Sequence, residues 1–174
     1  MKLASLYLLL LGILLIYGYN IKQSDYRNVS AYSKKPSIVK QKAKIRQDKN
    51  VGTLEFFFRQ FNSPLAGSSA DFIDAAKVYG LDWRLLPAIA GVESTFETAG
   101  NVYDHNPFGY MCRGVPCYFN SYSEGIWQVA KTISTNGAYK DFQQSKSIYE
   151  LAKTYNQVYP EAWTNHIEYF MRKI

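Results

Sequence analysis

The sequence is poor in cysteine and histidine, with only two of each among 174 residues. A structural zinc site needs about four such ligands, and His105 and His166 lie far apart in the sequence. A redox Cys-x-x-Cys motif is also missing, because Arg-Gly-Val-Pro separates Cys112 from Cys117. We therefore expect no metal site and no cofactor. In an oxidising compartment the two cysteines should instead form a disulfide around this turn-forming segment.

Residues 51–174 lack an excess of positive charge, although the whole chain has a formal net charge of +6. Residues 22–50 contain nine Lys or Arg against two Asp, whereas residues 51–174 contain ten basic and twelve acidic residues. We interpret residues 22–50 as a basic, disordered linker, which suits lipid headgroups or acidic wall polymers. We expect no nucleic-acid partner. The competing DNA-binding hypothesis predicts a steeply salt-dependent affinity that deletion of residues 20–50 removes.

Residues 3–19 contain no charged side chain and follow a single Lys2. This stretch is about as long as a membrane span requires. No small-x-small cleavage site follows it, since the chain continues as Tyr-Gly-Tyr-Asn. We predict that residues 1–21 are an uncleaved signal anchor with the domain on the extracytoplasmic side. A cleaved signal peptide, which would release the protein from the membrane, is the alternative.

Apolar residues recur at helical spacing through most of residues 51–174, which predicts one mainly α domain. Helices are expected at about 52–61, around Phe72–Tyr79 with Ser69 as N-cap and Gly80 as stop, and around Glu93 with Asp82 as N-cap. Further helices are expected from a Ser121–Glu124 capping box onward, near 147–156 and near 160–172. Pro87 should remove a backbone hydrogen bond from its helix. Residues 100–122 are rich in Gly, Asn, Pro and aromatic residues, so they predict a loop or short β-hairpin insert.

Glu93 is an unexpected residue on the face of its predicted helix. Helical spacing places it on the same face as Leu86, Ile89 and Ala90, which are apolar. We therefore expect its carboxyl group to be at least partly withdrawn from water. Desolvation raises a carboxyl pKa, and a glutamic acid that stays protonated near neutral pH can act as a general acid.

Three segments carry a family resemblance. Residues 79–94 read Tyr-Gly-Leu-Asp-Trp-Arg-Leu-Leu-Pro-Ala-Ile-Ala-Gly-Val-Glu-Ser, residues 106–111 read Asn-Pro-Phe-Gly-Tyr-Met, and residues 155–156 read Tyr-Asn. In this order they resemble the lysozyme-like superfamily, in particular bacterial lytic transglycosylase domains and domains similar to mannosyl-glycoprotein endo-β-N-acetylglucosaminidase. The resemblance covers about residues 62–172 and departs at Met111-Cys112, where transglycosylases often have Met-Gln.

The resemblance implies a lysozyme-like helical fold at the bacterial cell membrane that cleaves β-1,4 bonds of peptidoglycan. Glu93 would be the general acid, Phe108 and Tyr110 would offer apolar faces to sugar rings, and the backbone near Gly109 would grip an N-acetyl group. By resemblance, the residues expected to contact substrate or the acid are Ser94, Phe96, Asn106, Phe108, Gly109, Tyr110, Met111, Tyr155 and Asn156.

The identity of a second carboxylate separates two mechanisms. Hydrolysis by the two-carboxylate route needs a partner for Glu93, and the candidates are Glu97, Asp104 and Glu124. Glu124 already has a role in the capping box. A lytic transglycosylase needs no partner, because the 6-hydroxyl of muramic acid attacks and gives a 1,6-anhydro product. We therefore favour the transglycosylase, with a glucosaminidase or muramidase as the alternative.

Three non-catalytic interpretations stand beside this one. Glu93 could be a structural carboxylate paired with Arg84 or a lysine. Trp83, Trp127 and Trp163 fit helical apolar patterns and are expected to anchor the core rather than to bind sugar. The domain as a whole could bind wall glycan without cleaving it. The sequence makes no prediction about oligomeric state.

Overall fold

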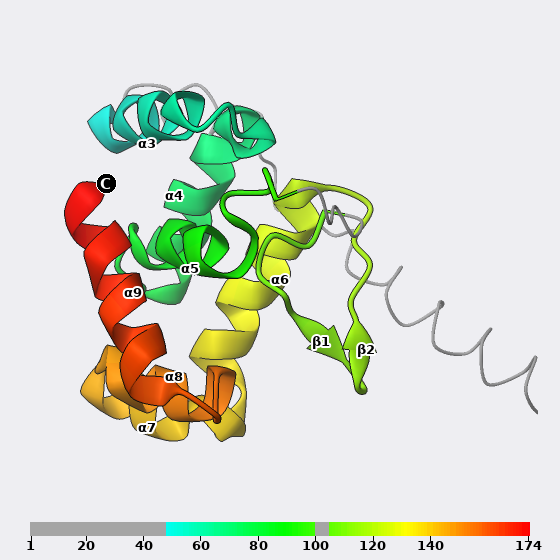
Figure 1. The fold of residues 1–174 in the computed structure, drawn as a ribbon, viewed down its shortest axis with the longest axis vertical. Helices are drawn as coiled ribbons and strands as arrows, with labels where there is room; N and C mark the ends of the chain where they lie inside the picture. Colours follow the sequence, from blue (N-terminus) through cyan, green and yellow to red (C-terminus); the bar gives the residue numbers. More distant parts are fainter. Residues whose placement is uncertain (1–47, 100–104) are drawn as a thin grey trace, which may run out of the picture. The chain divides into compact units, whose positions relative to one another are not determined.

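The structure is a computed structural model that describes residues 48–99 and 105–174. The predicted signal anchor, nearly all of the predicted linker and Asp104 lie outside these residues. The described residues belong to one compact unit and are mainly helical, as the sequence predicts (Figure 1). None of the helices in the described ranges is long and apolar enough to cross a membrane.

The first described helix, α3 (Lys49–Gln60), begins earlier than expected. The Asp48 side chain caps it by accepting a 2.9 Å hydrogen bond from the backbone N–H of Asn50. Residues 48–50, which we assigned to the linker, form the start of this helix. The buried face of α3 consists of Leu54, Phe57 and Phe58.

Helix α4 (Ser69–Tyr79) follows a short 3₁₀ turn, η1 (Pro64–Ser68). Its N-cap is Ser68 rather than the predicted Ser69, whose hydroxyl instead donates to the carbonyl of Ala66. Gly80 ends α4 in the left-handed conformation, at a φ of 63°, as predicted. Glycine suits this position because it has no Cβ to clash there.

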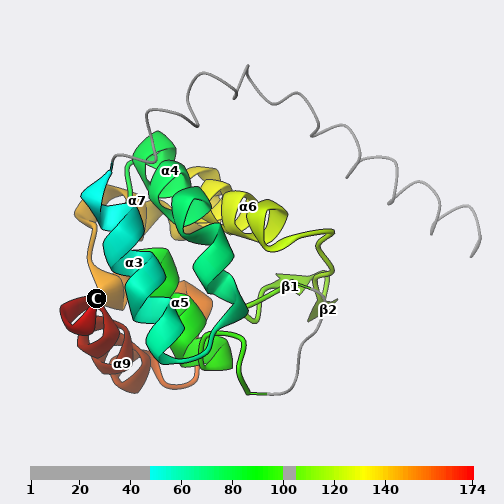
Figure 2. The same cartoon turned by 90° about the horizontal axis from the view of Figure 1, so that it is seen from above.

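Helix α5 (Leu85–Ser94) begins later than predicted, with Arg84 as its N-cap residue. Asp82 instead accepts a 2.9 Å hydrogen bond from the Arg84 backbone N–H in the preceding turn. Pro87 lies in the first helical turn, where backbone N–H groups have no intrahelical acceptor, so the predicted loss of a hydrogen bond does not occur. Residues 85–91 are all buried, and α5 lies between α9 and α6 in both views (Figures 1 and 2).

The irregular insert contains a short antiparallel hairpin of β1 (Met111–Cys112) and β2 (Val115–Pro116), which projects from the helical body (Figure 1). Cys112 and Cys117 form the predicted disulfide, with Cα atoms 4.9 Å apart. Helix α6 (Tyr122–Thr135) then begins at the predicted Ser121 cap, whose hydroxyl accepts from the Glu124 N–H at 3.2 Å.

The C-terminal part adds one helix that periodicity did not predict, α7 (Lys140–Ser145), after a 3₁₀ turn, η2 (Gly137–Tyr139). Helices α8 (Ile148–Tyr155) and α9 (Pro160–Lys173) lie close to their predicted ranges. Helix α9 packs against both α5 and α8, and α4 packs against α6. The end of α5, which carries Glu93, is therefore held between the C-terminal helices and the insert.

Candidate functional site

The chain turns sharply immediately after Glu93. Helix α5 stops at Ser94, and the N–H groups of Thr95 and Phe96 both donate to the Ala90 carbonyl, the second at 3.0 Å. Thr95, Phe96 and Glu97 all have left-handed backbone angles, with φ of 51°, 58° and 62°. Because the helix ends here, Glu97 does not continue the face that carries Glu93.

Two elements distant in the sequence contact the Glu93 carboxyl group. The indole Nε1–H of Trp163 in α9 donates a 2.7 Å hydrogen bond to Oε1. Gly109 of the insert lies on the other oxygen, since a Cβ added there would be 3.0 Å from Oε2. Gly109 also has a positive φ of 57°. The absence of a side chain at residue 109 therefore allows the backbone to approach the carboxyl group closely.

Glu93 keeps exposed surface as a residue, but its carboxyl group is partly surrounded by protein, as the apolar face predicts. It lies beyond the buried part of α5, near the helix end. Its pKa is raised, chiefly because the surrounding protein displaces water, while the Trp163 hydrogen bond lowers the pKa in part. Glu93 is thus both reachable by a ligand and biased toward its protonated form.

The proposed structural pairing of Glu93 with Arg84 is wrong. The Arg84 guanidinium pairs with Asp82 at 2.7 Å and also donates to the carbonyl of Met171 at 3.4 Å. Among the described residues, no lysine or arginine contributes to the pKa of Glu93. A carboxyl group held by one neutral donor has no counter-ion to keep it charged.

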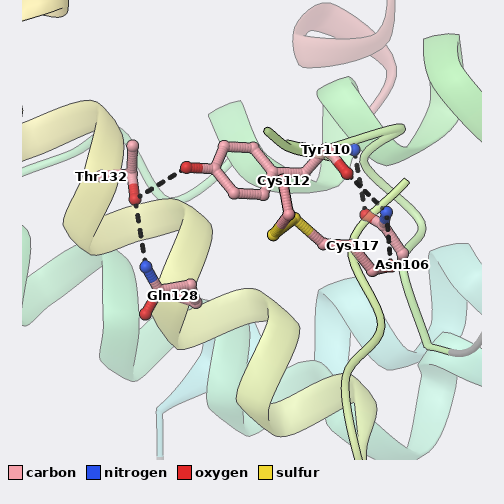
Figure 3. The surroundings of a disulfide bond; sticks show 6 residues. All are labelled: Asn106, Tyr110, Cys112, Cys117, Gln128 and Thr132. Atoms are coloured by element: carbon pink, nitrogen blue, oxygen red, sulfur yellow. Dashed lines mark hydrogen bonds between the residues drawn. A yellow bond between two sulfur atoms is a disulfide. The ribbon is translucent and has the colours of Figure 1, made fainter. Parts of the chain in front are cut away.

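Asn106 organises the loop that carries Gly109 rather than facing a ligand. Its amide nitrogen donates to the carbonyls of Tyr110 and Cys117 at 2.8 and 3.1 Å, and its Oδ1 accepts from the Tyr110 N–H at 3.0 Å (Figure 3). The side chain is buried and its hydrogen-bonding groups are all engaged. The predicted contact of Asn106 with substrate is therefore wrong.

Two aromatic residues assigned to substrate by resemblance belong to the core. Phe108 and Phe96 are both 0% exposed, so neither can offer a ring face to a sugar. The Phe108 ring packs at 6.1 Å from that of Phe72, and the Phe96 ring lies 4.5 Å from that of Phe61. These predictions are wrong because the apolar residues of the insert and of the α5 end fold inward.

Ser94 connects the end of α5 to the insert. Its hydroxyl lies 2.9 Å from the carbonyl of Ala90 and 3.0 Å from that of Pro107, and it accepts from the Glu97 N–H at 2.9 Å. Ser94 does lie beside the acid, as expected. Its hydroxyl is engaged by the protein, so the structure gives it a positioning role rather than a substrate contact.

Tyr155 and Trp163 form the wall behind Glu93. Their rings stack with centroids 5.2 Å apart, and the Tyr155 hydroxyl donates to the carbonyl of Phe108 at 2.7 Å. Asn156 accepts from the Tyr159 N–H at 3.2 Å and shapes the α8–α9 corner. Sequence reasoning placed Trp163 only in the core. It is 2% exposed, yet its single polar atom contacts Glu93, and no local sequence pattern signals that contact.

Tyr110, Met111 and the disulfide lie on the insert beside Gly109. The half-buried Tyr110 reaches α6, where its hydroxyl lies 3.3 Å from Oγ1 of Thr132 (Figure 3). Met111 is 51% exposed on β1. Of the residues expected to touch substrate from this segment, Gly109, Tyr110 and Met111 are the ones with accessible surface.

Two of the candidate second carboxylates, Glu97 and Glu124, lie in the described part of the chain, one buried and one hydrogen-bonded near a helix start. Glu97 is 6% exposed, and burial raises its pKa while His105 lowers it. Glu124 accepts hydrogen bonds from the N–H and the side-chain amide of Asn120 at 2.8 and 2.7 Å, one residue before the Ser121 N-cap that a capping box would use. Asp104 lies outside the described residues. The described residues contain no cluster of His, Cys, Asp or Glu suited to a metal ion.

Comparison with known proteins gives no match: no protein-family model, curated protein or solved structure is similar to this chain. The geometry of the site therefore carries the functional argument.

Proposed function

We propose that this protein cleaves β-1,4-glycosidic bonds of peptidoglycan as a lytic transglycosylase of the lysozyme-like superfamily, with Glu93 as the acid and then the base. The observation that carries this proposal is the state of the Glu93 carboxyl group. It belongs to an exposed residue, is partly desolvated with a raised pKa, and is held by one neutral donor, Trp163. A general acid needs this combination of accessibility and protonation.

In the proposed reaction the protonated Glu93 gives its proton to the glycosidic oxygen as the bond from that oxygen to C1 of muramic acid breaks. The 6-hydroxyl of the same sugar then attacks C1 and returns its proton to the Glu93 carboxylate. The products are a free 4-hydroxyl on the leaving sugar and a 1,6-anhydro ring. No water is consumed, and the enzyme ends in its starting protonation state.

The surroundings of the other carboxylates support the transglycosylase over a two-carboxylate hydrolase. A nucleophile or base must reach the anomeric carbon or a water molecule beside it. Glu97 is buried, and the Glu124 carboxylate is already engaged by two hydrogen bonds from Asn120. A glucosaminidase or muramidase that uses Asp104 is the second candidate, and a non-catalytic glycan-binding domain is the third.

We also propose that the domain works outside the cytoplasm, attached through residues 3–19. The disulfide between Cys112 and Cys117 supports this location, because disulfides persist in oxidising compartments. A membrane-impermeant biotin reagent applied to intact cells should label exposed lysines such as Lys140. Labelling only after cell lysis would contradict the proposed topology.

Mass spectrometry of soluble fragments released from purified peptidoglycan tests the activity. The complete chain in detergent should release muropeptides with 1,6-anhydro ends, which are lighter by one water than reducing ends. Glu93→Gln should abolish release while leaving the thermal unfolding midpoint close to that of the wild type, because glutamine keeps the shape of the side chain. Glu168→Gln, at an exposed carboxylate on α9, is the matched control and should keep full activity.

Each product pattern leads to a different conclusion. Fragments with reducing muramic acid indicate a muramidase, and fragments with reducing N-acetylglucosamine indicate a glucosaminidase. Sedimentation of the protein with peptidoglycan but no released fragment from the wild type supports the binding domain. Unchanged release by Glu93→Gln would disprove the role of Glu93.

A further inference from the structure

Trp163 is the one described side chain that donates a hydrogen bond to the Glu93 carboxyl group, and the bond goes to a single oxygen, Oε1, at 2.7 Å. An indole nitrogen carries a hydrogen and is a donor only, so it cannot accept a hydrogen bond from a protonated carboxyl oxygen. The carbonyl oxygen of a neutral carboxyl group is a better acceptor than its hydroxyl oxygen, so this contact favours Oε1 as the carbonyl oxygen when Glu93 is neutral.

We infer that Trp163 fixes the acidic proton of Glu93 on Oε2, so that a glycosidic oxygen is protonated from the side of Gly109. This inference rests on the proposed function for its substrate but not for the assignment of the proton. Trp163 is a positioning residue in this scheme, since it acts through Glu93 and does not touch the substrate.

The indole is held firmly enough to impose the choice of oxygen. Trp163 is 2% exposed, and its ring stacks on that of Tyr155 at 5.2 Å. Tyr155 is in turn tied to the insert by its 2.7 Å hydrogen bond to the Phe108 carbonyl. Rotation of the indole away from Oε1 would break this packing, so the donor stays in place through a change in the charge of Glu93.

The geometry on the other side of the carboxyl group leaves Oε2 approachable. Gly109 is exposed and carries no side chain over Oε2, whereas an added Cβ would lie only 3.0 Å from Oε2 and crowd it. A sugar oxygen that accepts the proton must therefore pass over the backbone of Gly109. The same path brings the substrate along the backbone of the insert, where amide groups can hold an N-acetyl group.

The ionisable group that faces Glu93 from α8 does not compete for the proton. Burial raises the pKa of the Tyr155 phenol well above its usual value, and the nearby Glu93 raises it further, so this phenol stays neutral. Arg84, at the N-terminal end of α5, pairs with Asp82 rather than with Glu93. The residues of α9 and of the insert that contact the Glu93 carboxyl group are Trp163 and Gly109, and neither side chain is ionisable.

Indole NMR tests the assignment without using activity. The complete chain in detergent, labelled with ¹⁵N-tryptophan, is titrated with acid, and the Trp163 signal is identified by its loss in Trp163→Phe. The NMR signal of its N–H should shift as Glu93 is protonated. Below the midpoint of that titration, the N–H should stay protected from exchange with solvent. In Glu93→Gln the pH dependence should vanish.

The matched control is Trp127→Phe, since Trp127 also donates to a carboxylate, Asp71, at 3.2 Å. This change should leave the Trp163 titration untouched. Loss of Trp163 protection below the midpoint would place the proton on Oε1 and overturn the inference. A Trp163 signal that does not change with pH would also overturn the inference.

A pH–rate profile supplies the second readout. Removing the indole N–H removes the interaction that lowers the pKa of Glu93, so Trp163→Phe should move the alkaline limb of glycan release to higher pH. Trp127→Phe should leave that limb in place. An indole that titrates in a protein without glycan release would refute the proposed function but keep the proton assignment. An active enzyme whose Trp163 N–H loses protection below the midpoint would keep the proposed function but refute the proton assignment.

Discussion

The Tyr155 hydroxyl donates a 2.7 Å hydrogen bond to the carbonyl of Phe108, which joins the end of α8 to the insert 47 residues earlier in the chain. The next residue of the insert, Gly109, lies against the Glu93 carboxyl group. The Tyr155 ring also stacks on Trp163, the donor to Glu93. One side chain thus positions the groups on both sides of the carboxyl.

Tyr155→Phe should reduce glycan release while keeping the fold. The change leaves the Phe108 carbonyl without its phenol donor and should lower the free energy of unfolding by about 1–3 kcal/mol. Fragment release and chemical denaturation measure the two effects. Tyr149→Phe removes an exposed phenol that donates to Glu161 and should change neither quantity by much. Equal behaviour of the two variants would contradict the positioning role of Tyr155.

Gly109→Ala should lower turnover strongly, because the new Cβ would lie 3.0 Å from Oε2 and displace the Glu93 carboxyl group. Misplacement of a catalytic group by about 1 Å can cost about 100-fold in rate. Gly80→Ala is the matched control, since Gly80 also has a positive φ, 63°, but has no atom within 4 Å of an added Cβ. Both variants should lose similar stability, about 1–2 kcal/mol, from the left-handed backbone.

The kinetic comparison separates a local clash from general destabilisation. At a temperature where both variants are folded, only Gly109→Ala should release fragments slowly. An equal loss of activity in Gly80→Ala would show that the rate reports stability rather than the contact with Glu93.

Gly91→Ala should destabilise the domain. An added Cβ would lie 2.6 Å from the ring of Phe96 and 3.1 Å from that of Phe170, in the contact between α5 and α9. Such overpacking costs about 1–3 kcal/mol. Gly52→Ala in α3 meets no atom within 4 Å and should stabilise the domain by about 0.5–1 kcal/mol through helix propensity. Urea denaturation measures both, and stabilisation by Gly91→Ala would contradict the close packing.

Glu97→Gln should change how stability depends on pH. Burial raises the pKa of Glu97 in the folded state, with the nearby His105 lowering it in part. A raised folded pKa means that the folded state binds the proton more tightly, so Glu97 contributes stability below its unfolded pKa and loses it as pH rises through the folded value. Tyr122, whose pKa is raised in part by Glu97, faces the same group.

The stability of the wild type relative to Glu97→Gln should therefore decrease as pH rises above about 4.5, near the usual pKa of a glutamic acid. Denaturation at pH 4 and pH 7 measures the difference. Glu168→Gln, at an exposed site, should show a much smaller dependence. A wild type that gains stability over Glu97→Gln with rising pH would contradict the raised pKa.

Local signals predicted much of the helical framework. The left-handed Gly80 that ends α4 and the Ser121–Glu124 cap of α6 depend on neighbours within one helical turn, so their residues specify them directly. Helix α7 escaped prediction because Phe142 is its one buried residue and six residues give no periodicity. The start of α5 was misplaced because Asp82 caps a turn before the helix rather than the helix itself.

The sequence by itself determined the mainly helical class, the pairing of Cys112 with Cys117 and the choice of Glu93 as the candidate acid, since each follows from spacing or composition within a short segment. Only the tertiary structure decided the surroundings of Glu93. Trp163 lies 70 residues away, and its contact depends on how α9 packs against α5. The inward turn of Phe96 and Phe108 likewise depends on which apolar side chains the whole core accepts, because helical or loop position alone does not fix burial.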